Sequence, residues 1–384
     1  MNNIFLLGAT GSIGTQVLDV VRCKGGNIIS ISIGKNIKKA KEIIEEFNPE
    51  YISVLDESDM LLLQKEYPNK IFGYGEEGLI KAATYSNKDG VLVNAVVGMI
   101  GLKPTIEAIK LKRNILLANK ETLVVAGEII TKLAKEYEVS LIPIDSEHSA
   151  ILQCIGDRKN EEIENIIITA SGGTFRNKTR DEITNVTLKD VLNHPNWSMG
   201  AKITVDSATM VNKGLEVIEA HFLFNIDYDK IKTVIHYESI IHSLVEFKDR
   251  SVIAQLSIPD MRIPIQYALT YPKKLEYDLS PRIDFSKLNL SFKEMDFNRY
   301  PCLKLAYEVG KMGGIMPTVY NASNEEAVSL FMEGKIKFLE IEEIIFSAVK
   351  NAINIINPTI NDIINTAKEV RIKIRDNYLY NRKD

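Results

Sequence analysis

Several kinds of protein are excluded by what this 384-residue sequence has little of. Its three cysteines, Cys23, Cys154 and Cys302, are far apart and form no CxxC pair, so neither a disulfide framework nor a zinc site is predicted. The most apolar stretch, Val91–Leu102, includes Asn94 and two glycines and is shorter than the about 20 residues that span a membrane. The N-terminus has no basic region of the kind found in targeting segments. We therefore expect a cytoplasmic protein without membrane association.

No sign of charge dominates either. The 47 Lys and Arg residues nearly balance the 51 Asp and Glu residues, which gives a net charge of -4. This balance argues against nucleic acid as a partner, although a local basic pocket for a phosphate group remains possible. A hydrophobic content of 45% and the length of the chain predict a globular protein of two or three domains.

From residue 1 to about 142, short β-branched apolar runs alternate with helical patterns. This alternation is typical of an α/β domain with a parallel sheet. Strands are predicted over Ile4–Leu7, Asn27–Ile33, Tyr51–Leu55, Val91–Val97, Ile115–Ala118 and Val139–Ile142. Helices are predicted over Ser12–Lys24, Asn36–Phe47, Glu76–Thr84, Gly101–Lys112 and Glu121–Glu136.

Beyond residue 150 the regular alternation is lost. Residues 143–270 are predicted to form an α+β domain, with a helix near Met210–Phe224 and strands over Ile163–Thr169, Lys232–His236, Leu244–Phe247 and Val252–Ser257. Residues 271–300 have weak periodicity and are interpreted as a linker. Residues 301–384 have helical periodicity, with apolar residues such as Ile341, Ile344 and Ile345 at i, i+3 and i+4, and predict a helical bundle.

Three glycines, Gly8, Gly11 and Gly14, lie between the first predicted strand and the first predicted helix. Their spacing is a variant of the G-x-G-x-x-G dinucleotide motif, in which glycine lets backbone N–H groups approach a pyrophosphate. The alternative is a turn that needs glycine only for steric reasons. Because this is the first strand-to-helix connection of an alternating domain, we favour a Rossmann-like dinucleotide site.

The residues after the second predicted strand favour NADP(H) over NAD(H). An NAD site usually has Asp or Glu there to hold the ribose 2′-hydroxyl. Here the sequence is Gly34-Lys35-Asn36, without a carboxylate, and Lys35 suits a 2′-phosphate. The alternative is that Lys35 is only a solvated loop residue.

Asp145 and Glu147 follow the last predicted strand of the first domain. In an extended backbone both side chains would face the same way and could hold one cation, whereas His148 would point away as a neighbour rather than a ligand. The alternative is that Asp145 or Ser146 only caps a helix over Ser149–Ile155.

A second acidic motif, Asn212-Lys213-Gly214-Leu215-Glu216, lies in a helical stretch. Asn212 and Lys213 precede Glu216 by four and three residues, so the three side chains share one helix face. Oxygen ligands of this kind suit Mg²⁺ or Mn²⁺. The alternative is a surface ion pair between Lys213 and Glu216.

Several motifs occur in one order along the chain: Gly8–Gly14, Gly34–Asn36, Asn119–Glu121, Asp145–Glu147, Ser171–Gly173, His194–Gly200 and Asn212–Glu216. With them the whole chain resembles the 1-deoxy-D-xylulose 5-phosphate reductoisomerase family. That family uses NADPH and a divalent metal to make 2-C-methyl-D-erythritol 4-phosphate in non-mevalonate isoprenoid biosynthesis. The resemblance implies a homodimer of chains with an N-terminal NADPH-binding domain (1–142), a catalytic domain (143–270) with a lid at 193–201, a linker (271–300) and a C-terminal helical domain (301–384).

The resemblance also implies the site residues. Those expected to contact NADPH are Thr10, Gly11, Ser12, Ile13, Gly34, Lys35, Asn36, Asn119, Glu121 and Gly200. Those expected to contact the phosphorylated sugar substrate are Lys120, Ser146, Glu147, Ser171, His194, Trp197, Ser207, Asn212, Lys213 and Glu216. Asp145, Glu147 and Glu216 would ligate Mg²⁺ or Mn²⁺, which would act as a Lewis acid in a retro-aldol and aldol rearrangement before hydride transfer. Lys120 would stabilise developing negative charge, so the catalytic set is Lys120 with the three carboxylates.

One segment departs from the family pattern. Tyr237-Glu238 stands before Ser239–His242 where the family commonly has Pro-Gln, which leaves the shape of this part of the site open. Two other functions are considered. Another NADP-linked oxidoreductase would leave the carboxylates and the lid unexplained, and a non-catalytic NADPH-sensing module would not need Lys120 and all three carboxylates.

Overall fold

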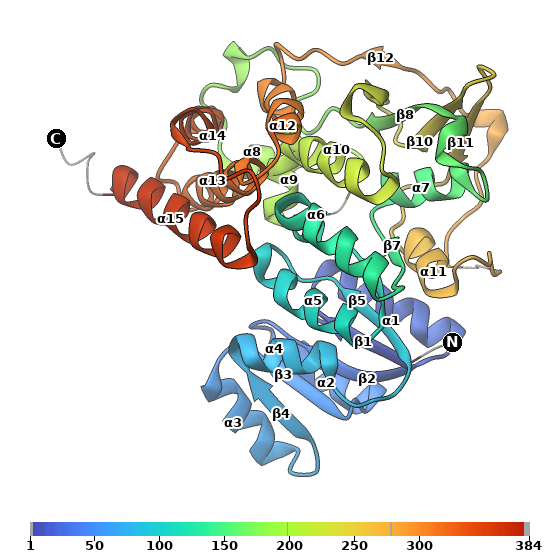
Figure 1. The fold of residues 1–384 in the computed structure, drawn as a ribbon, viewed down its shortest axis with the longest axis vertical. Helices are drawn as coiled ribbons and strands as arrows, with labels where there is room; N and C mark the ends of the chain where they lie inside the picture. The colour runs from blue at the N-terminus through green and yellow to red at the C-terminus, as the bar shows by residue number, and fades with distance from the viewer. Residues whose placement is uncertain (1–2, 198, 277–278, 380–384) are drawn as a thin grey trace. The chain divides into compact units, whose positions relative to one another are not determined.

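The structure is a computed structural model that describes residues 3–197, 199–276 and 279–379 (Figure 1). The chain divides into two compact units. Unit 1 consists of Met1–Thr122, Glu128–Leu152 and Asp260–Pro281, and unit 2 of Leu123–Gly127, Gln153–Pro259 and Arg282–Asp384. The four-part domain division expected from the sequence stays a prediction.

Unit 1 is built on a parallel sheet with the strand order β4-β3-β2-β1-β5-β6-β7. Its strands are β1 (Asn3–Leu7), β2 (Asn27–Ser32), β3 (Tyr51–Val54), β4 (Ile71–Tyr74), β5 (Gly90–Asn94), β6 (Asn114–Leu117) and β7 (Leu141–Pro143). The chain winds outward from β1 in one direction and then, from β5, in the other. Ligands of such sheets bind at the carboxyl ends of the strands beside this reversal, which is where the Gly8–Gly14 turn lies.

Helices lie between the strands of unit 1 or follow them. They are α1 (Ser12–Lys24), α2 (Ile37–Phe47), α3 (Glu57–Glu66), α4 (Gly75–Thr84), α5 (Leu102–Lys110), α6 (Lys120–Glu136), α7 (Ser146–Ile155) and α11 (Arg262–Thr270). Of these, α6 and α7 belong to unit 1 only in part. Apolar residues of α1, α2 and α11 form one core with β1 and β2, which includes Val17, Ile44, Ile265 and Ile31. Figure 1 shows α4 and α5 side by side, and the two helices are in contact.

The sequence pattern did not predict α3 and β4. Within α3 only Leu63 is buried, while Leu61 and Leu62 are exposed, so the helix has no clear apolar stripe. In β4, Ile71 is exposed because the strand lies at the edge of the sheet and pairs only with β3. Both elements therefore lack the hydrophobic periodicity from which helices and strands are predicted.

Unit 2 contains a mixed sheet with the strand order β11-β10-β8-β9-β12. Its strands are β8 (Ile163–Ala170), β9 (Ile231–Ile235), β10 (Ile241–Phe247), β11 (Val252–Leu256) and β12 (Lys293–Glu294). β8 and β9 are parallel and the other pairs are antiparallel. The short β12 comes from the predicted linker, where two exposed residues carry too little pattern to predict a strand.

The helices of unit 2 are α8 (Leu188–Val191), α9 (Ala201–Ala208), α10 (Val211–Phe224), α12 (Pro301–Met312), α13 (Met316–Met332), α14 (Glu340–Asn351) and α15 (Ile360–Leu379). α13 is buried on most sides and packs against α12, α14 and α15. α10 packs closely on α12, since a Cβ at Gly214 would lie 2.6 Å from the Ala306 Cβ. Lys213 and Glu216 of the same helix are also buried.

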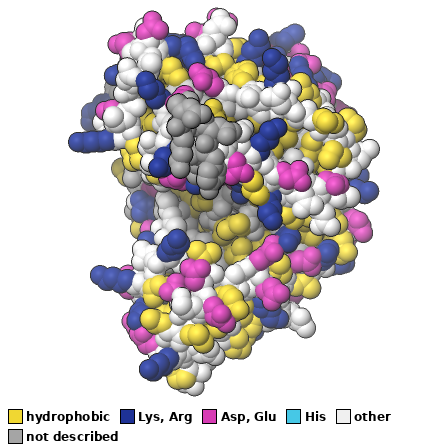
Figure 2. Space-filling model, turned by 90° about the vertical axis from the view of Figure 1, so that its left-hand side faces the viewer, with side chains coloured by type: hydrophobic (Ala, Val, Ile, Leu, Met, Phe, Trp, Pro, Cys, Tyr) yellow, Lys and Arg dark blue, Asp and Glu magenta, His cyan; other side chains and the backbone are white. Residues whose placement is uncertain are grey.

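On the surface drawn in Figure 2, basic and acidic side chains are interspersed with apolar ones. This mixture agrees with the small net charge of -4. Within the described ranges, none of the helices combines the length and the apolar content that crossing a membrane requires.

Candidate active site

The Gly8–Gly14 turn joins β1 to α1 by close backbone contacts. Gly8 has a φ of +82°, and a Cβ there would lie 2.5 Å from the Ala95 carbonyl oxygen. A Cβ at Gly14 would lie 2.1 Å from the Gly8 carbonyl oxygen, so neither position accepts a side chain. Gly11 is the N-cap of α1, and no described side chain caps that helix. The first N–H groups of α1, including those of Ser12 and Ile13, therefore suit an anionic ligand.

The turn after β2 lies against the glycine turn. The Gly34 N–H donates to Thr10 Oγ1 at 3.4 Å, and the Gly8 N–H donates to Ser32 Oγ at 2.9 Å. Asn36 caps α2, because its Oδ1 accepts a hydrogen bond from the Lys39 N–H at 3.1 Å. The structure thus brings Thr10 and Gly34 together and leaves Lys35 exposed beside them.

Asn119 supports the loop that follows β5. Its Nδ2 donates to the carbonyl oxygens of Val96 and Gly98 at 2.9 and 2.8 Å, and its Oδ1 caps α6 by accepting from the Thr122 N–H. The same amide donates to Glu121 Oε2 at 3.1 Å, and both residues are buried. Their contacts with NADPH stay predictions, and the visible role of the Asn119 side chain is to position the backbone opposite Gly8.

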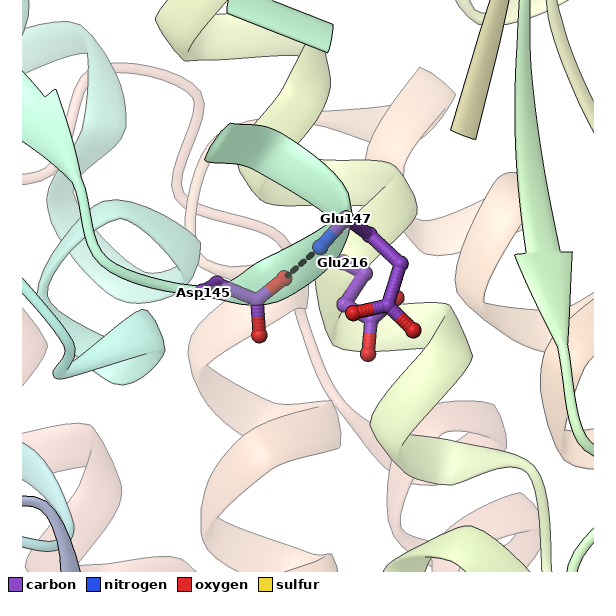
Figure 3. A group of neighbouring side chains, drawn as sticks. All are labelled: Asp145, Glu147 and Glu216. Atoms are coloured by element: carbon purple, nitrogen blue, oxygen red, sulfur yellow. Dashed lines mark hydrogen bonds between the residues drawn. The ribbon is translucent and has the colours of Figure 1, made fainter. Parts of the chain in front are cut away.

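Asp145 and Glu147 lie at the start of α7 (Figure 3). The expected extended backbone is wrong, because α7 begins at Ser146 rather than at Ser149. Asp145 Oδ1 accepts from the Glu147 N–H at 3.2 Å, as in a helix cap, and Ser146 Oγ donates to Glu147 Oε2 at 2.6 Å. One carboxylate oxygen from each of Asp145, Glu147 and Glu216 lies within 4.8 Å of the other two. Asp145 therefore caps α7 and also belongs to a group of carboxylates close enough to share one cation.

Asp145 also holds two partners within unit 1. Lys120 Nζ lies 2.5 Å from its Oδ2, and His148 Nδ1 lies 2.9 Å from its Oδ1. The prediction that His148 points away is wrong, because the first turn of α7 places the residue at i+3 beside Asp145. Burial alone would raise the pKa of Asp145, but the Lys120 ammonium and the hydrogen bond with His148 hold that pKa well below its ordinary value. Asp145 stays ionised, as a metal ligand must.

Glu216 is held by two side chains of its own helix. Asn212 Nδ2 donates to Glu216 Oε1 at 2.5 Å, and Lys213 Nζ donates to Glu216 Oε2. Lys213 and Glu216 are 4% and 1% exposed, so the alternative of a surface ion pair is wrong. A buried pair of this kind is costly to break, because each charge then loses a partner away from solvent.

His194 connects two of the predicted phosphate-binding segments. Its Nε2 lies 3.1 Å from Ser171 Oγ, and its Nδ1 accepts hydrogen bonds from the N–H groups of Asn196 and Trp197. Because Nδ1 accepts, the neutral ring carries its proton on Nε2 and donates to Ser171. Burial, and then the charge of Arg176, lower the pKa of His194 to about 4. His194 is therefore a neutral hydrogen-bond donor near pH 7.

The Ser171–Gly173 loop lies against the end of α9. Gly172 and Gly173 have φ values of +86° and +71°, and a Cβ at Gly173 would lie 2.6 Å from the Ser207 carbonyl oxygen. This contact brings Ser207 to the loop that carries Ser171. Gly200 is the exposed N-cap of α9. Within the expected lid, the Trp197 ring lies 6.0 Å from that of His242, and Ser198 lies outside the described residues.

Two residues of this region were not among the predicted site residues. Arg176 Nη1 donates to the carbonyl oxygens of Ser171 and Tyr237 at 3.4 and 3.0 Å. Asn196 Nδ2 donates to the Tyr237 carbonyl oxygen at 2.5 Å. No sequence pattern marks these contacts, because the acceptors are backbone carbonyl groups that every residue has.

The His194 ring should titrate with a midpoint of about 4, well below the ordinary histidine value. Since its pKa in the folded state is the lower one, His194 stabilises the fold above pH 6.5, and this contribution is lost as the pH falls toward 4. NMR titration of the histidine ring carbons, with the His194 signal assigned from its loss in His194→Asn, measures the midpoint. A midpoint near 6.5 would show that the ring is solvated and not held as described.

Family models match three parts of the chain. Residues 4–127 match 1-deoxy-D-xylulose 5-phosphate reductoisomerase, residues 141–224 match the C-terminal domain of that enzyme, and residues 256–373 match a second DXP reductoisomerase C-terminal domain. The 1-deoxy-D-xylulose 5-phosphate reductoisomerase of Geobacillus sp. (strain WCH70) is 53% identical over 379 residues, which are 98% of this chain and 99% of that protein.

Solved structures agree with these matches. A crystal structure of DOX-P reductoisomerase in complex with NADPH, fosmidomycin and magnesium has a TM-score of 0.94 and 35% identity, and the match covers 100% of both chains. The Zymomonas mobilis 1-deoxy-D-xylulose 5-phosphate reductoisomerase in complex with NADPH has a TM-score of 0.90 and 36% identity over 99% of each chain. The predicted α/β fold class and the predicted family are thus confirmed. This chain belongs to the 1-deoxy-D-xylulose 5-phosphate reductoisomerase family.

Proposed function

We propose that this protein is an NADPH-dependent and metal-dependent reductoisomerase. It rearranges 1-deoxy-D-xylulose 5-phosphate and reduces the product to 2-C-methyl-D-erythritol 4-phosphate. The observation that carries this proposal is the cluster of Asp145, Glu147 and Glu216, in a chain of this family whose Lys120 is paired with Asp145. A simple NADP-linked oxidoreductase has no need of such a cluster.

The three carboxylates fit a hard divalent cation such as Mg²⁺ or Mn²⁺. All of the donor atoms are oxygens, and the ligand oxygens of one Mg²⁺ ion lie about 3–4 Å apart. The three carboxylate oxygens lie within 4.8 Å of one another, a slightly wider spacing than that. Small side-chain rotations would close the difference. A bound cation would supply a Lewis acid for the ketone and hydroxyl oxygens of the substrate. Asp145, kept ionised by Lys120 and His148, is ready to ligate it.

Two turns of unit 1 suit NADPH: the glycine turn after β1 and the turn after β2. The glycine turn has no room for a side chain at Gly8, and no described side chain caps the start of α1, where a pyrophosphate would bind. Lys35 is exposed after β2, where a 2′-phosphate would lie. We assign NADPH contacts to both turns, with Asn119 and Glu121 supporting the loop opposite them.

The substrate phosphate is assigned to the predicted set of Ser171, His194, Ser207, Asn212 and Lys213. His194 is neutral and its Nε2 proton donates to Ser171, so the pair can pass hydrogen bonds on to a phosphate oxygen. Lys213 provides positive charge, and Trp197 is assigned to the lid that excludes water from the substrate.

Lys120 and Ser146 are assigned to the reacting end of the substrate. The Lys120 ammonium, 2.5 Å from Asp145, can stabilise negative charge that develops on a substrate oxygen beside the cluster. The Ser146 hydroxyl, which donates a hydrogen bond to Glu147, can orient a substrate hydroxyl group.

We also propose that the protein is a homodimer, as in its family, and that it is cytoplasmic. The free thiols of Cys23, Cys154 and Cys302 support a reducing, cytoplasmic location.

Purified protein should consume NADPH when it is given 1-deoxy-D-xylulose 5-phosphate with Mg²⁺ or Mn²⁺. A chelator should stop the reaction, and added metal should restore it, because the three carboxylates need a cation to polarise the substrate. The absorbance of NADPH measures the rate. An undiminished rate in the presence of chelator would rule out the assigned role of the carboxylates.

Replacing Lys35 by Asp should lower the preference for NADPH over NADH by about 10- to 100-fold, since it removes a cation from the expected 2′-phosphate position. The preference is measured as the ratio of kcat/KM for the two cofactors. Lys38→Asp makes the same charge change at an exposed position of α2 and serves as the control. Equal effects of the two variants would mean that only the general charge matters.

A further inference from the structure

The segment His236–Ile240, between β9 and β10, joins the two loops that carry Ser171 and His194. The Tyr237 carbonyl oxygen accepts hydrogen bonds from Arg176 Nη1 at 3.0 Å and from Asn196 Nδ2 at 2.5 Å. Arg176 lies five residues after Ser171 and also donates to its carbonyl oxygen. Asn196 lies two residues after His194, and its N–H donates to the His194 ring. One carbonyl group thus fixes both loops.

The Tyr237 side chain holds Arg176 in this arrangement. The guanidinium carbon of Arg176 lies 4.7 Å from the centre of the Tyr237 ring, and the Tyr237 hydroxyl donates to the Arg176 carbonyl oxygen at 3.4 Å. The ring also packs on the Ser171–Gly173 loop, since a Cβ at Gly172 would lie 3.2 Å from Tyr237 Cε1. Lys293 Nζ lies 4.5 Å from the ring centre. A ring that contacts two cations is well placed to set the direction of one of them.

The His236 side chain holds the start of this segment in place. His236 is buried, and its Nε2 accepts a hydrogen bond from the Ile241 N–H at 3.1 Å. Its Nδ1 therefore carries the proton, 2.8 Å from the Ser291 carbonyl oxygen and 3.0 Å from Glu238 Oε2. Glu238 Oε1 in turn accepts from Ser291 Oγ at 2.6 Å. Tyr237 is thus attached to a backbone with little freedom to move.

We propose that Tyr237 is a positioning residue for the substrate phosphate. Its ring directs the Arg176 guanidinium onto the carbonyl oxygens of Ser171 and Tyr237, and this keeps the Ser171 hydroxyl in contact with the His194 ring. The proposal rests on the proposed function, since it takes Ser171 and His194 as the phosphate contacts. Tyr237 itself acts through Arg176 and does not need to touch the substrate.

The test compares Tyr237→Leu with Tyr237→Phe. The Leu variant loses the aromatic ring and should raise the KM for 1-deoxy-D-xylulose 5-phosphate about tenfold, while kcat and the KM for NADPH stay within about twofold of wild type. The Phe variant keeps the ring and should rescue the KM. Tyr85→Leu removes a comparable ring, 6.0 Å from Lys81 Nζ in unit 1, and should leave the KM unchanged.

A second readout does not depend on turnover. Inorganic phosphate is titrated against each protein, and the fluorescence of Trp197, the single tryptophan of the chain, reports binding. The Leu variant should bind phosphate about tenfold more weakly and the Phe variant as wild type. If wild type binds phosphate but consumes no NADPH, the proposed function fails while this comparison still tests the positioning.

Three results would overturn the proposal: an unchanged KM and phosphate affinity in Tyr237→Leu, a Phe variant as impaired as the Leu variant, or a loss confined to kcat. If Tyr237→Leu fails to fold, Arg176→Lys replaces it as the test. Lysine keeps the charge but cannot donate to two carbonyl groups in a fixed plane, so the same rise in KM is expected. An unchanged KM in Arg176→Lys would then overturn the proposal.

Discussion

Glu216→Gln should lower turnover by about 10³-fold while NADPH binds as tightly as to wild type. The substitution removes one anionic ligand from the cluster of three carboxylates, and the cation it helps to hold supplies several kcal/mol of charge stabilisation. The glycine turn, which is assigned to NADPH, contains none of these ligands. Steady-state rates at saturating Mn²⁺ and the fluorescence of bound NADPH measure the two effects separately.

The buried partner of Glu216 complicates this experiment and requires a control. Without the carboxylate, the Lys213 ammonium loses a buried ion-pair partner, and breaking such a pair costs about 3–5 kcal/mol of folding free energy. Glu147→Gln removes another ligand at a half-buried position and should lose turnover with a smaller fall in Tm. Two results would mean that the carboxylates are structural. In one, the loss of turnover in both variants is no larger than their fall in Tm explains. In the other, both variants lose NADPH affinity as strongly as they lose turnover.

Lys120→Met should lower kcat by about 10²- to 10³-fold, the usual effect of removing one group that stabilises developing charge. Methionine is similar in length, so the packing at the start of α6 is preserved. Lys132→Met changes an exposed lysine of the same helix and should leave kcat unchanged.

The affinity for Mn²⁺ separates a role of Lys120 in catalysis from a role in building the metal site. Lys120 Nζ lies 2.5 Å from Asp145 Oδ2 and competes with a cation for that carboxylate. Lys120→Met should therefore bind Mn²⁺ at least as tightly as wild type, as measured by electron paramagnetic resonance. Weaker binding together with the fall in kcat would mean that Lys120 supports the ligands and not the reaction.

Much of unit 1 was predictable because local pattern and chemistry agree. The first helix was predicted at Ser12–Lys24 and is found there, since a glycine turn precedes it and Gly25 follows it. The predicted strand Val91–Val97 instead ends at Asn94. The apolar residues after Asn94 continue the pattern, but Ala95 lies against Gly8 and Val97 is 68% exposed. Contacts with the glycine turn, and not hydrophobicity, end the strand.

The sequence and the family resemblance provide candidate site residues, whose roles stay predictions, but not the contacts between them. The sequence provided the carboxylates and Lys120, yet the Lys120–Asp145 pair joins residues 25 positions apart and depends on the way β6 and β7 pair. The orientation of His148 was wrong, because it depends on the position at which α7 begins. Arg176 and Tyr237 were not predicted to act together, because their contacts are with backbone carbonyl groups and a ring face.

The most direct test of the proposed function identifies the carbon skeleton of the product. Protein, NADPH, Mn²⁺ and 1-deoxy-D-xylulose 5-phosphate are incubated together, and the product is identified by NMR. We predict one branched product, 2-C-methyl-D-erythritol 4-phosphate, for each NADPH oxidised, and none with Glu216→Gln. A reduced product with an unbranched skeleton would contradict the proposed function and indicate a simple oxidoreductase.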